Sequence, residues 1–138
     1  MRILAGSAAT LLVILTACGR PIERAEVPGT YRSEYDFATT QLTLSPDGTF
    51  SQEVRLKSGD TAQQKGVWRY DTAAQRLTLD KCLDVNDGFR RLNKEYRTPM
   101  VCNLPVGQSS ARQDGIRLGS EEGNPYWKVG PPQARASP

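Results

Sequence analysis

The sequence predicts an all-β domain, a mainly antiparallel meander that forms a barrel or a sandwich, with one short helix or irregular excursion. Three observations support this prediction. Apolar and polar side chains alternate through residues 29–79, as in strands with one buried face. Turn-forming residues interrupt the alternation at intervals of about 8 to 12 residues, which is typical of sandwiches and up-and-down barrels. Residues 80–104 break this rhythm, and the alternation then returns near the end of the chain.

The first 17 residues predict a secretory signal. The positively charged start, Met1-Arg2, precedes an apolar or small stretch from Ile3 to Leu15, and small residues follow it. A transmembrane helix would need about 20 consecutive apolar residues, and this run is shorter and diluted by small and polar residues. We therefore expect residues 1–17 to be a signal peptide that directs export and is then removed.

The signal ends in Leu15-Thr16-Ala17-Cys18, which resembles the bacterial lipobox, a sequence cut just before its cysteine after the sulfur has been acylated. The resemblance implies a lipoprotein that is lipidated on Cys18 and held to a membrane through that lipid anchor. Stable anchoring takes at least two acyl chains, and the resemblance implies more than one, palmitate among them. Gly19, not an acidic residue, follows the cysteine, which in Gram-negative lipoproteins implies the outer membrane, facing the periplasm.

The mature chain divides into a tether, one domain and a tail. Residues 18–28 are mostly polar, which predicts a soluble spacer that need not fold. Residues 29–129 contain the alternating pattern and are enough for one domain. Residues 130–138 have three prolines and no apolar pattern, which predicts a disordered tail. Without Arg2, 17 basic residues stand against 15 acidic ones, a balance that argues against a nucleic-acid partner.

The predicted strands follow from local patterns. Leu42 and Leu44 share one face, and Phe50 and Val54 share one face after the turn Ser45-Pro46-Asp47-Gly48. Proline presets the backbone of that turn and glycine tolerates a positive φ, so the pair of strands reads as a hairpin. The full set of predicted strands is 29–31, 42–44, 50–56, 65–70, 76–79, 116–118 and 126–129.

Three short segments resemble small lipocalin-like lipoprotein domains of no assigned activity. They are residues 44–50, Gly66-Val67-Trp68 and Leu77-Thr78-Leu79. Gly29-Thr30-Tyr31 stands where lipocalins proper carry Gly-x-Trp in the first strand. The resemblance implies a lipocalin-like barrel. It also implies, as one alternative, a carrier or sensor of a small apolar ligand in the barrel interior.

Residues 80–104 are the most distinctive part of the domain. Phe89, Leu92 and Tyr96 recur at helical spacing. This pattern indicates a short helix or ordered excursion that Thr98-Pro99 would end, or alternatively a long, twisted pair of edge strands. The opposite face of the segment would be basic, with Arg90, Arg91, Lys94 and Arg97.

Two cysteines, Cys82 and Cys102, bracket the excursion. Export brings the chain into an oxidising compartment, and Cys18 would be occupied by lipid, so these two have one partner each. We expect a disulfide that closes a loop of about 20 residues and stabilises the fold by roughly 3 kcal/mol. Two free, buried thiols are the alternative.

The composition argues against an enzyme. The chain has no histidine, so Ser-His and Cys-His arrangements are excluded, and no Ser-x-x-Lys sequence occurs. Asp84 with Asp87, and Glu121 with Glu122, lie in polar sequence where burial as a catalytic pair is not expected. Two cysteines without histidine cannot complete a zinc shell. We therefore expect no enzyme, no metal site and no cofactor.

The favoured hypothesis is an envelope lipoprotein that acts as a non-enzymatic binding or interaction module. Its contacts would come from Arg90, Arg91, Lys94 and Arg97, which face a protein, anionic lipid or polysaccharide partner, or are simply a solvated surface. The alternatives are the carrier of an apolar ligand and an inhibitor of an enzyme that attacks the envelope. A carrier requires an enclosed cavity of roughly 300 Å³. A binding module should instead show a filled interior and an exposed patch on the excursion.

Overall fold

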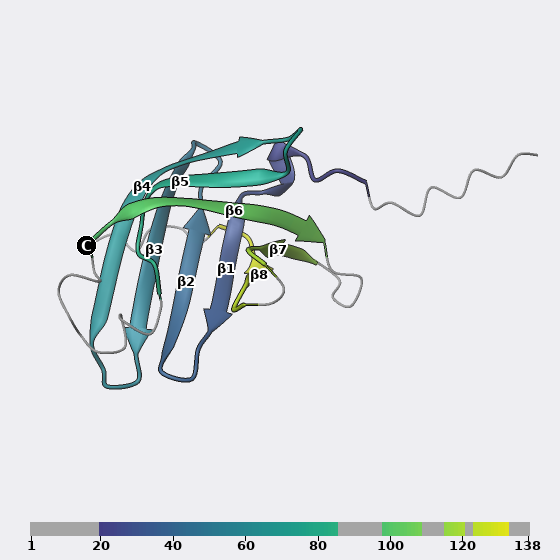
Figure 1. Ribbon diagram of the computed structural model, residues 1–138. Coiled ribbons are helices and arrows are strands. Elements are labelled where there is room, and N and C mark those ends of the chain that lie inside the picture. Colours follow the sequence, from purple (N-terminus) through teal and green to yellow (C-terminus); the bar gives the residue numbers. More distant parts are fainter. Residues whose placement is uncertain (1–19, 86–97, 109–114, 121–122, 133–138) are drawn as a thin grey trace, which may run out of the picture.

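The computed structural model describes residues 20–85, 98–108, 115–120 and 123–132. These form a closed barrel of eight antiparallel strands in sequence order, each paired with the next and the first paired with the last (Figure 1). The all-β prediction is confirmed, and of its two architectures the barrel is correct. A 3₁₀ helix, η1 (Arg24–Glu26), precedes the strands. The strands are β1 (Gly29–Glu34), β2 (Ala38–Leu44), β3 (Thr49–Leu56), β4 (Thr61–Asp71), β5 (Arg76–Cys82), β6 (Met100–Gln108), β7 (Ile116–Leu118) and β8 (Tyr126–Gly130).

The β2–β3 hairpin forms as its sequence predicts. Leu44 pairs with Phe50, and both side chains are buried inside the barrel. Gly48 has a φ of 89°, a left-handed conformation that glycine adopts without a steric penalty. The Asp47 carboxylate accepts a hydrogen bond from the backbone N–H of Thr49 at 2.9 Å, which fixes the turn.

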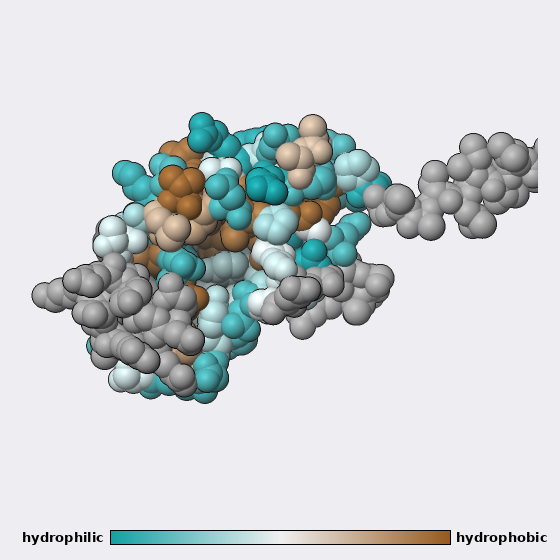
Figure 2. All heavy atoms as spheres, in the orientation of Figure 1, coloured by the Kyte–Doolittle hydropathy of each residue, from teal (hydrophilic) through white to brown (hydrophobic). Residues whose placement is uncertain are grey.

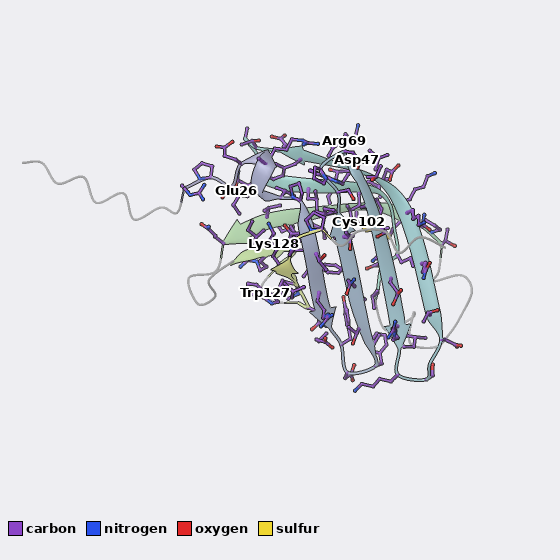
Figure 3. The ribbon with its side chains drawn as sticks, turned by 180° about the vertical axis from the view of Figure 1, so that it is seen from behind. Glu26, Asp47, Arg69, Cys102, Trp127 and Lys128 are labelled. Carbon is purple, nitrogen blue, oxygen red and sulfur yellow. A yellow bond between two sulfur atoms is a disulfide. The ribbon has the colours of Figure 1, made fainter. Side chains whose placement is uncertain are left out.

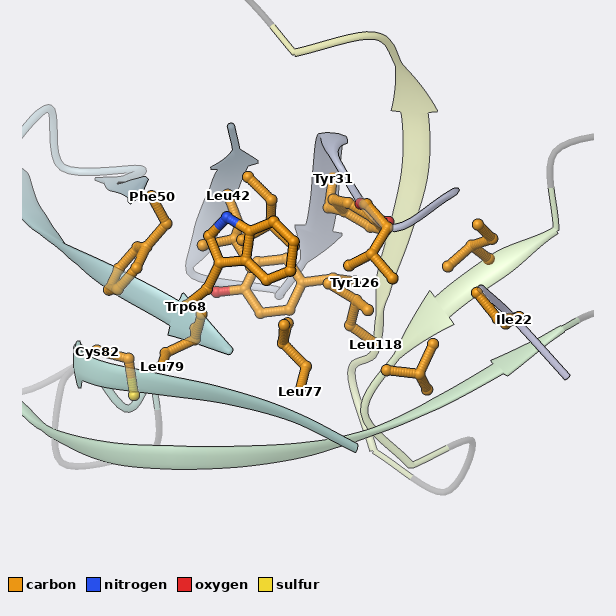
Figure 4. Packing of buried hydrophobic residues seen from close by; sticks show 14 residues of the cluster. Ile22, Tyr31, Leu42, Phe50, Trp68, Leu77, Leu79, Cys82, Leu118 and Tyr126 are labelled. Carbon is orange, nitrogen blue, oxygen red and sulfur yellow. The ribbon is translucent and has the colours of Figure 1, made fainter. Parts of the chain in front are cut away.

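Large apolar side chains fill most of the barrel (Figure 4). Trp68 is 1% exposed, and Tyr31 and Leu42 are fully buried. The polar atoms of the buried rings are satisfied: the indole N–H of Trp68 donates to the carbonyl of Ser45 at 2.8 Å, and the Tyr31 hydroxyl donates to the carbonyl of Val27 at 2.6 Å. The core is therefore packed around hydrogen-bonded aromatic anchors.

The segment before β1 folds against one end of the barrel. Ile22 is 3% exposed and Val27 is fully buried, and both belong to the core. Residues 18–28 were predicted to be a spacer that need not fold, and the described part, residues 20–28, differs from this prediction. The physical reason is that this end of the barrel would expose apolar side chains to water if Ile22 and Val27 did not cover them. We call this the plugged end.

Strand β6 is absent from the predicted set. Its inward side chains, Cys102, Leu104 and Val106, alternate as expected of a strand. Pro105 lies opposite Arg76 in the β5–β6 ladder, although proline cannot donate a ladder hydrogen bond. The helix predicted within the 80–104 excursion falls on residues 86–97, outside the described residues, as does the tail from residue 133 onward. The described parts of the excursion hold the end of β5 at Cys82 and the start of β6 at Met100. Gly130 and Pro131 of that tail are ordered, because β8 ends at Gly130 and the Pro131 carbonyl accepts a hydrogen bond from Thr30.

The end opposite the plug has a second, smaller core. It lies beside the β1–β2 and β3–β4 turns, at the bottom of Figure 1. We call this end the mouth. The chain leaves β5 there and contributes two buried side chains. The buried members of this core are Ala38, Val54, Leu56, Leu83 and Val85.

Candidate binding site at the mouth of the barrel

A disulfide joins the two strands that lead into and out of the distinctive segment. Cys82 ends β5 and Cys102 lies near the start of β6, with their Cα atoms 6.0 Å apart. That separation falls within the range of protein disulfides. The structure therefore confirms the predicted pairing of Cys82 with Cys102. The bond fixes the two ends of the intervening residues on neighbouring strands.

A buried glutamine holds the chain immediately after the disulfide. The Gln52 side chain, 3% exposed, accepts a hydrogen bond from the backbone N–H of Leu83 at 2.7 Å and donates to the Leu83 carbonyl at 2.9 Å. It also donates to the Tyr126 hydroxyl at 3.0 Å. The amide thus gives Leu83 the two bonds that a neighbouring strand would give. A buried backbone group without such partners would be destabilising.

A small cavity lies beside this clamp. Its volume is about 110 Å³, and Tyr35, Gln52, Asp84, Tyr126 and the disulfide contribute to its lining. Pockets for small organic ligands have volumes of about 300 to 1,000 Å³. This cavity, as the described residues line it, is therefore too small for the apolar ligand that a carrier would enclose.

The tyrosines at the cavity stay protonated at neutral pH. Burial, with smaller contributions from Tyr126 and Asp84, raises the pKa of Tyr35 to about 12. Burial also raises the pKa of Tyr126. These hydroxyl groups are consequently neutral hydrogen-bonding groups, and neither is poised to act as a base near pH 7.

The outer surface beside the disulfide carries exposed apolar side chains. Val67, Met100 and Val101 are 50%, 50% and 56% exposed, and we call them the apolar patch. Trp68, Leu79 and Cys102 lie opposite one another across β4, β5 and β6 and point inward, so Val67 and Val101 point outward from the same part of the barrel wall. Brown side chains gather over these strands in Figure 2.

A second surface feature lies on the outer side of β1 and β8. A groove of about 300 Å³ is lined by residues that include Arg32, Glu34, Asn124 and Trp127. Trp127 pairs with Arg32 across the strands and is half-buried (Figure 3). From the sequence, Trp127 is the aromatic residue expected to line an opening rather than the core. The other residues of the groove give no sequence signal, because they come together only when β8 closes the barrel against β1.

Several predicted site residues lie outside the described part of the chain. These are Cys18 and the four basic residues Arg90, Arg91, Lys94 and Arg97. The structure describes instead the strands on either side of the basic segment and the contacts that hold them. Lipidation and the role of the basic residues therefore remain predictions.

Within the described ranges, His, Cys, Asp and Glu side chains form no group of three that could hold a metal ion. The same residues contain no helix with the length and apolar character needed to cross a membrane. Comparison of the chain with protein-family models, curated proteins and solved structures gives no match.

Proposed function

We propose that this protein is an exported, lipid-anchored envelope lipoprotein that acts as a non-enzymatic interaction module. Its lipid would be on Cys18, and its partner would bind the outer wall at β4–β6, next to the disulfide-bounded segment. The observation that carries the proposal is the combination of a packed interior with the apolar patch beside the Cys82–Cys102 disulfide.

The packed interior favours surface binding over transport. Trp68, Tyr31 and Leu42 fill the space that a carrier would leave for its ligand. The cavity of about 110 Å³ at the mouth is well below the roughly 300 Å³ that a carrier requires. The barrel is better suited to hold its outer surface in a fixed shape than to enclose a ligand.

The apolar patch supplies a contact surface. Exposed apolar side chains that gather on one face of a folded domain can mark an interaction site. Val67 and Val101 project from the same wall, on either side of Asp80 of β5. Here Met100 and Val101 follow directly after the basic segment, and the disulfide prevents the patch and that segment from separating. In the proposed complex, Arg90, Arg91, Lys94 and Arg97 add contacts to an acidic protein, anionic lipid or polysaccharide around an apolar centre.

The lipid is tested by a single substitution. Cys18→Ser removes the sulfur that would be acylated, so we expect an uncut precursor without lipid, detected by intact-mass measurement of the membrane fraction. Normal cleavage and membrane retention of this variant would overturn the lipoprotein part of the proposal.

The partner surface is tested by photocrosslinking in cells. A photoreactive amino acid at Val101 should give a discrete adduct, whereas the same group at Arg55, exposed on β3, should not. Val67→Asp in the Val101 photoprobe protein should weaken the adduct without changing the unfolding temperature. Equal adducts from positions 101 and 55, or none from either, would contradict a partner surface at β4–β6.

A further inference from the structure

The first described residues leave almost no free chain between the barrel and Cys18. The backbone N–H of Ile22 donates to the side-chain oxygen of Gln75 at 2.9 Å. The Ile22 carbonyl accepts hydrogen bonds from the Tyr70 hydroxyl at 2.6 Å and the Gln75 amide at 3.3 Å. Ile22 is also 3% exposed. Both the backbone and the side chain of this residue are therefore fixed to the barrel.

The other residues of the segment before β1 are also bonded to one another or to the barrel (Figure 3). The Arg20 guanidinium makes two hydrogen bonds to the Glu26 carboxylate, at 2.6 and 3.0 Å. The Lys128 ammonium, from β8, donates to the Glu26 carbonyl at 2.7 Å. The Arg24 guanidinium lies 4.5 Å from the centre of the Trp68 ring. These contacts connect the segment that follows Cys18 to β8, through Lys128, and to β4, through Trp68.

Chain length then limits how far the barrel can lie from its anchor. Cys18 is four residues before Ile22, and a fully extended chain spans at most about 3.6 Å per residue. The Cα atom of Cys18 must therefore lie within about 14 Å of the Cα atom of Ile22. A flexible spacer of ten residues would have a root-mean-square length of about 17 Å and could extend further in any direction.

We propose that the plugged end of the barrel faces the bilayer that holds the lipid of Cys18, while the mouth faces away from it and the apolar patch lies on the side wall. This orientation rests on the proposed lipid anchor. A bilayer surface is the partner that the short connection selects, because the acylated sulfur must reach the membrane interface. The plugged end carries both signs of charge, with Arg20, Arg24 and Arg76 near Glu23 and Asp71. Chain length, not charge, sets the orientation, which should therefore persist at high salt.

Two turns at opposite ends of β4 provide the measuring points. Ala73 is exposed in the turn after β4, next to Gln75 at the plugged end, and Ser58 is exposed in the turn before β4, at the mouth. The 11 residues of β4 separate them, and strands rise about 3.3 Å per residue. Because barrel strands tilt by about 35–45°, the two turns differ in height by at most roughly 25 Å.

The experiment uses lipidated full-length protein in vesicles of phosphatidylethanolamine and phosphatidylglycerol that carry a headgroup-attached acceptor dye. Ala73→Cys and Ser58→Cys each add one free thiol for a donor dye, since Cys18 bears lipid and Cys82 is bonded to Cys102. We expect energy transfer from position 73 to be at least threefold more efficient than from position 58. A ten-residue Gly-Ser insertion between Gly19 and Arg20 should bring the ratio close to one.

The outcomes separate the orientation from the anchor. Intact mass establishes whether the purified chain carries lipid, and the Cys18→Ser variant should leave the vesicles unlabelled. A chain without lipid would overturn both the anchor and the orientation. A lipidated chain with equal transfer from the two positions, or with greater transfer from position 58, would overturn the orientation alone.

Discussion

The two ends of the barrel differ in the size of their apolar cores and in the bonds that hold the chain there. At the plugged end, Ile22 and Val27 join a continuous apolar core with Trp68. At the mouth, the chain is held by one buried amide, Gln52, and by the disulfide of Cys82. The plugged end thus combines the larger core with hydrogen bonds to the backbone of Ile22, whereas the mouth combines a smaller core with the Gln52 clamp and the disulfide.

This difference separates global stability from local order. Removing a large side chain from a shared core weakens every strand that packs against it. Removing a directional contact at the mouth releases mainly the segment that the contact holds, so the barrel itself can persist. The plugged end would serve as the rigid base of the proposed module, and the mouth would set the shape of its contact surface.

The largest expected effect is at the plugged end. Trp68→Ala removes a side chain that is 1% exposed, and we expect the free energy of unfolding to fall by about 3–5 kcal/mol. Urea unfolding followed by circular dichroism measures the change. Trp127→Ala, which removes the same ring from a half-buried position, is the matched control and should cost about 1 kcal/mol or less. Similar losses for the two variants would contradict the assignment of Trp68 as the core anchor.

The disulfide is expected to have the next largest effect. Replacing Cys82 and Cys102 together by serine should lower the free energy of unfolding by about 3 kcal/mol, because the unfolded chain gains freedom over a 20-residue loop. Hydrogen exchange should show that the loss of protection is greatest in β5 and β6 near the mouth. Uniform loss of protection around the barrel would show that the two ends are not independent.

The elements that the sequence predicts correctly are those with local signals. The β2–β3 hairpin combines alternation with a Pro-Asp-Gly turn, all within residues 42–56. The cysteine pair follows from the number of cysteines and the expected compartment. The hairpin needs no knowledge of distant parts of the chain, and the cysteine pair needs only the cysteine count and the signal at the start of the chain.

The missed elements depend on distant partners. Ile22 is one apolar residue in a polar stretch. Its backbone partner, Gln75, lies 53 positions later and meets it only when the barrel has formed. Gln52 alternates as an inward strand residue, but its partner Leu83 is 31 positions away. Pro105 argues against a strand in the sequence, and β6 becomes evident only from its pairing with β5. Single contacts over such separations leave no periodic pattern to read.

The Gln52 clamp should have a smaller, more local effect than the disulfide. Gln52→Ala leaves the N–H and carbonyl of Leu83 without their partner, and we expect a loss of about 2 kcal/mol. Gln64 lies opposite Gln52 in the β3–β4 ladder, and its amide donates to the Lys65 carbonyl near the surface. Gln64→Ala is therefore the matched control, and it should cost less than about 0.5 kcal/mol in thermal unfolding. Equal losses of stability for the two variants would show that the Gln52 hydrogen bonds do not stabilise the mouth.

The smallest expected effect appears at alkaline pH and compares a tyrosine at each end. Burial raises the pKa of Tyr35, at the mouth, to about 12, and it also raises the pKa of Tyr31, near the plug. An unfolded tyrosine loses its proton near pH 10. Above that pH the folded state holds these tyrosine protons more tightly than the unfolded state. The tyrosine contribution to stability should therefore be constant below about pH 10 and should fall from about pH 10 toward 12.

Tyr35→Phe should make that fall shallower, because it removes one of the groups that titrates differently in the two states. The change should stay well below about 1 kcal/mol per pH unit, since solvent reaches the half-exposed Tyr35 ring and screens the effect. Tyr31→Phe should change the slope more, because the Tyr31 side chain is fully buried. Urea unfolding at pH 10, 11 and 12 measures both slopes, because the two variants diverge as the pH approaches the folded-state pKa of Tyr35, about 12. A larger change for Tyr35→Phe than for Tyr31→Phe would show that the mouth is drier than the plugged end, which would reverse the comparison between the two ends.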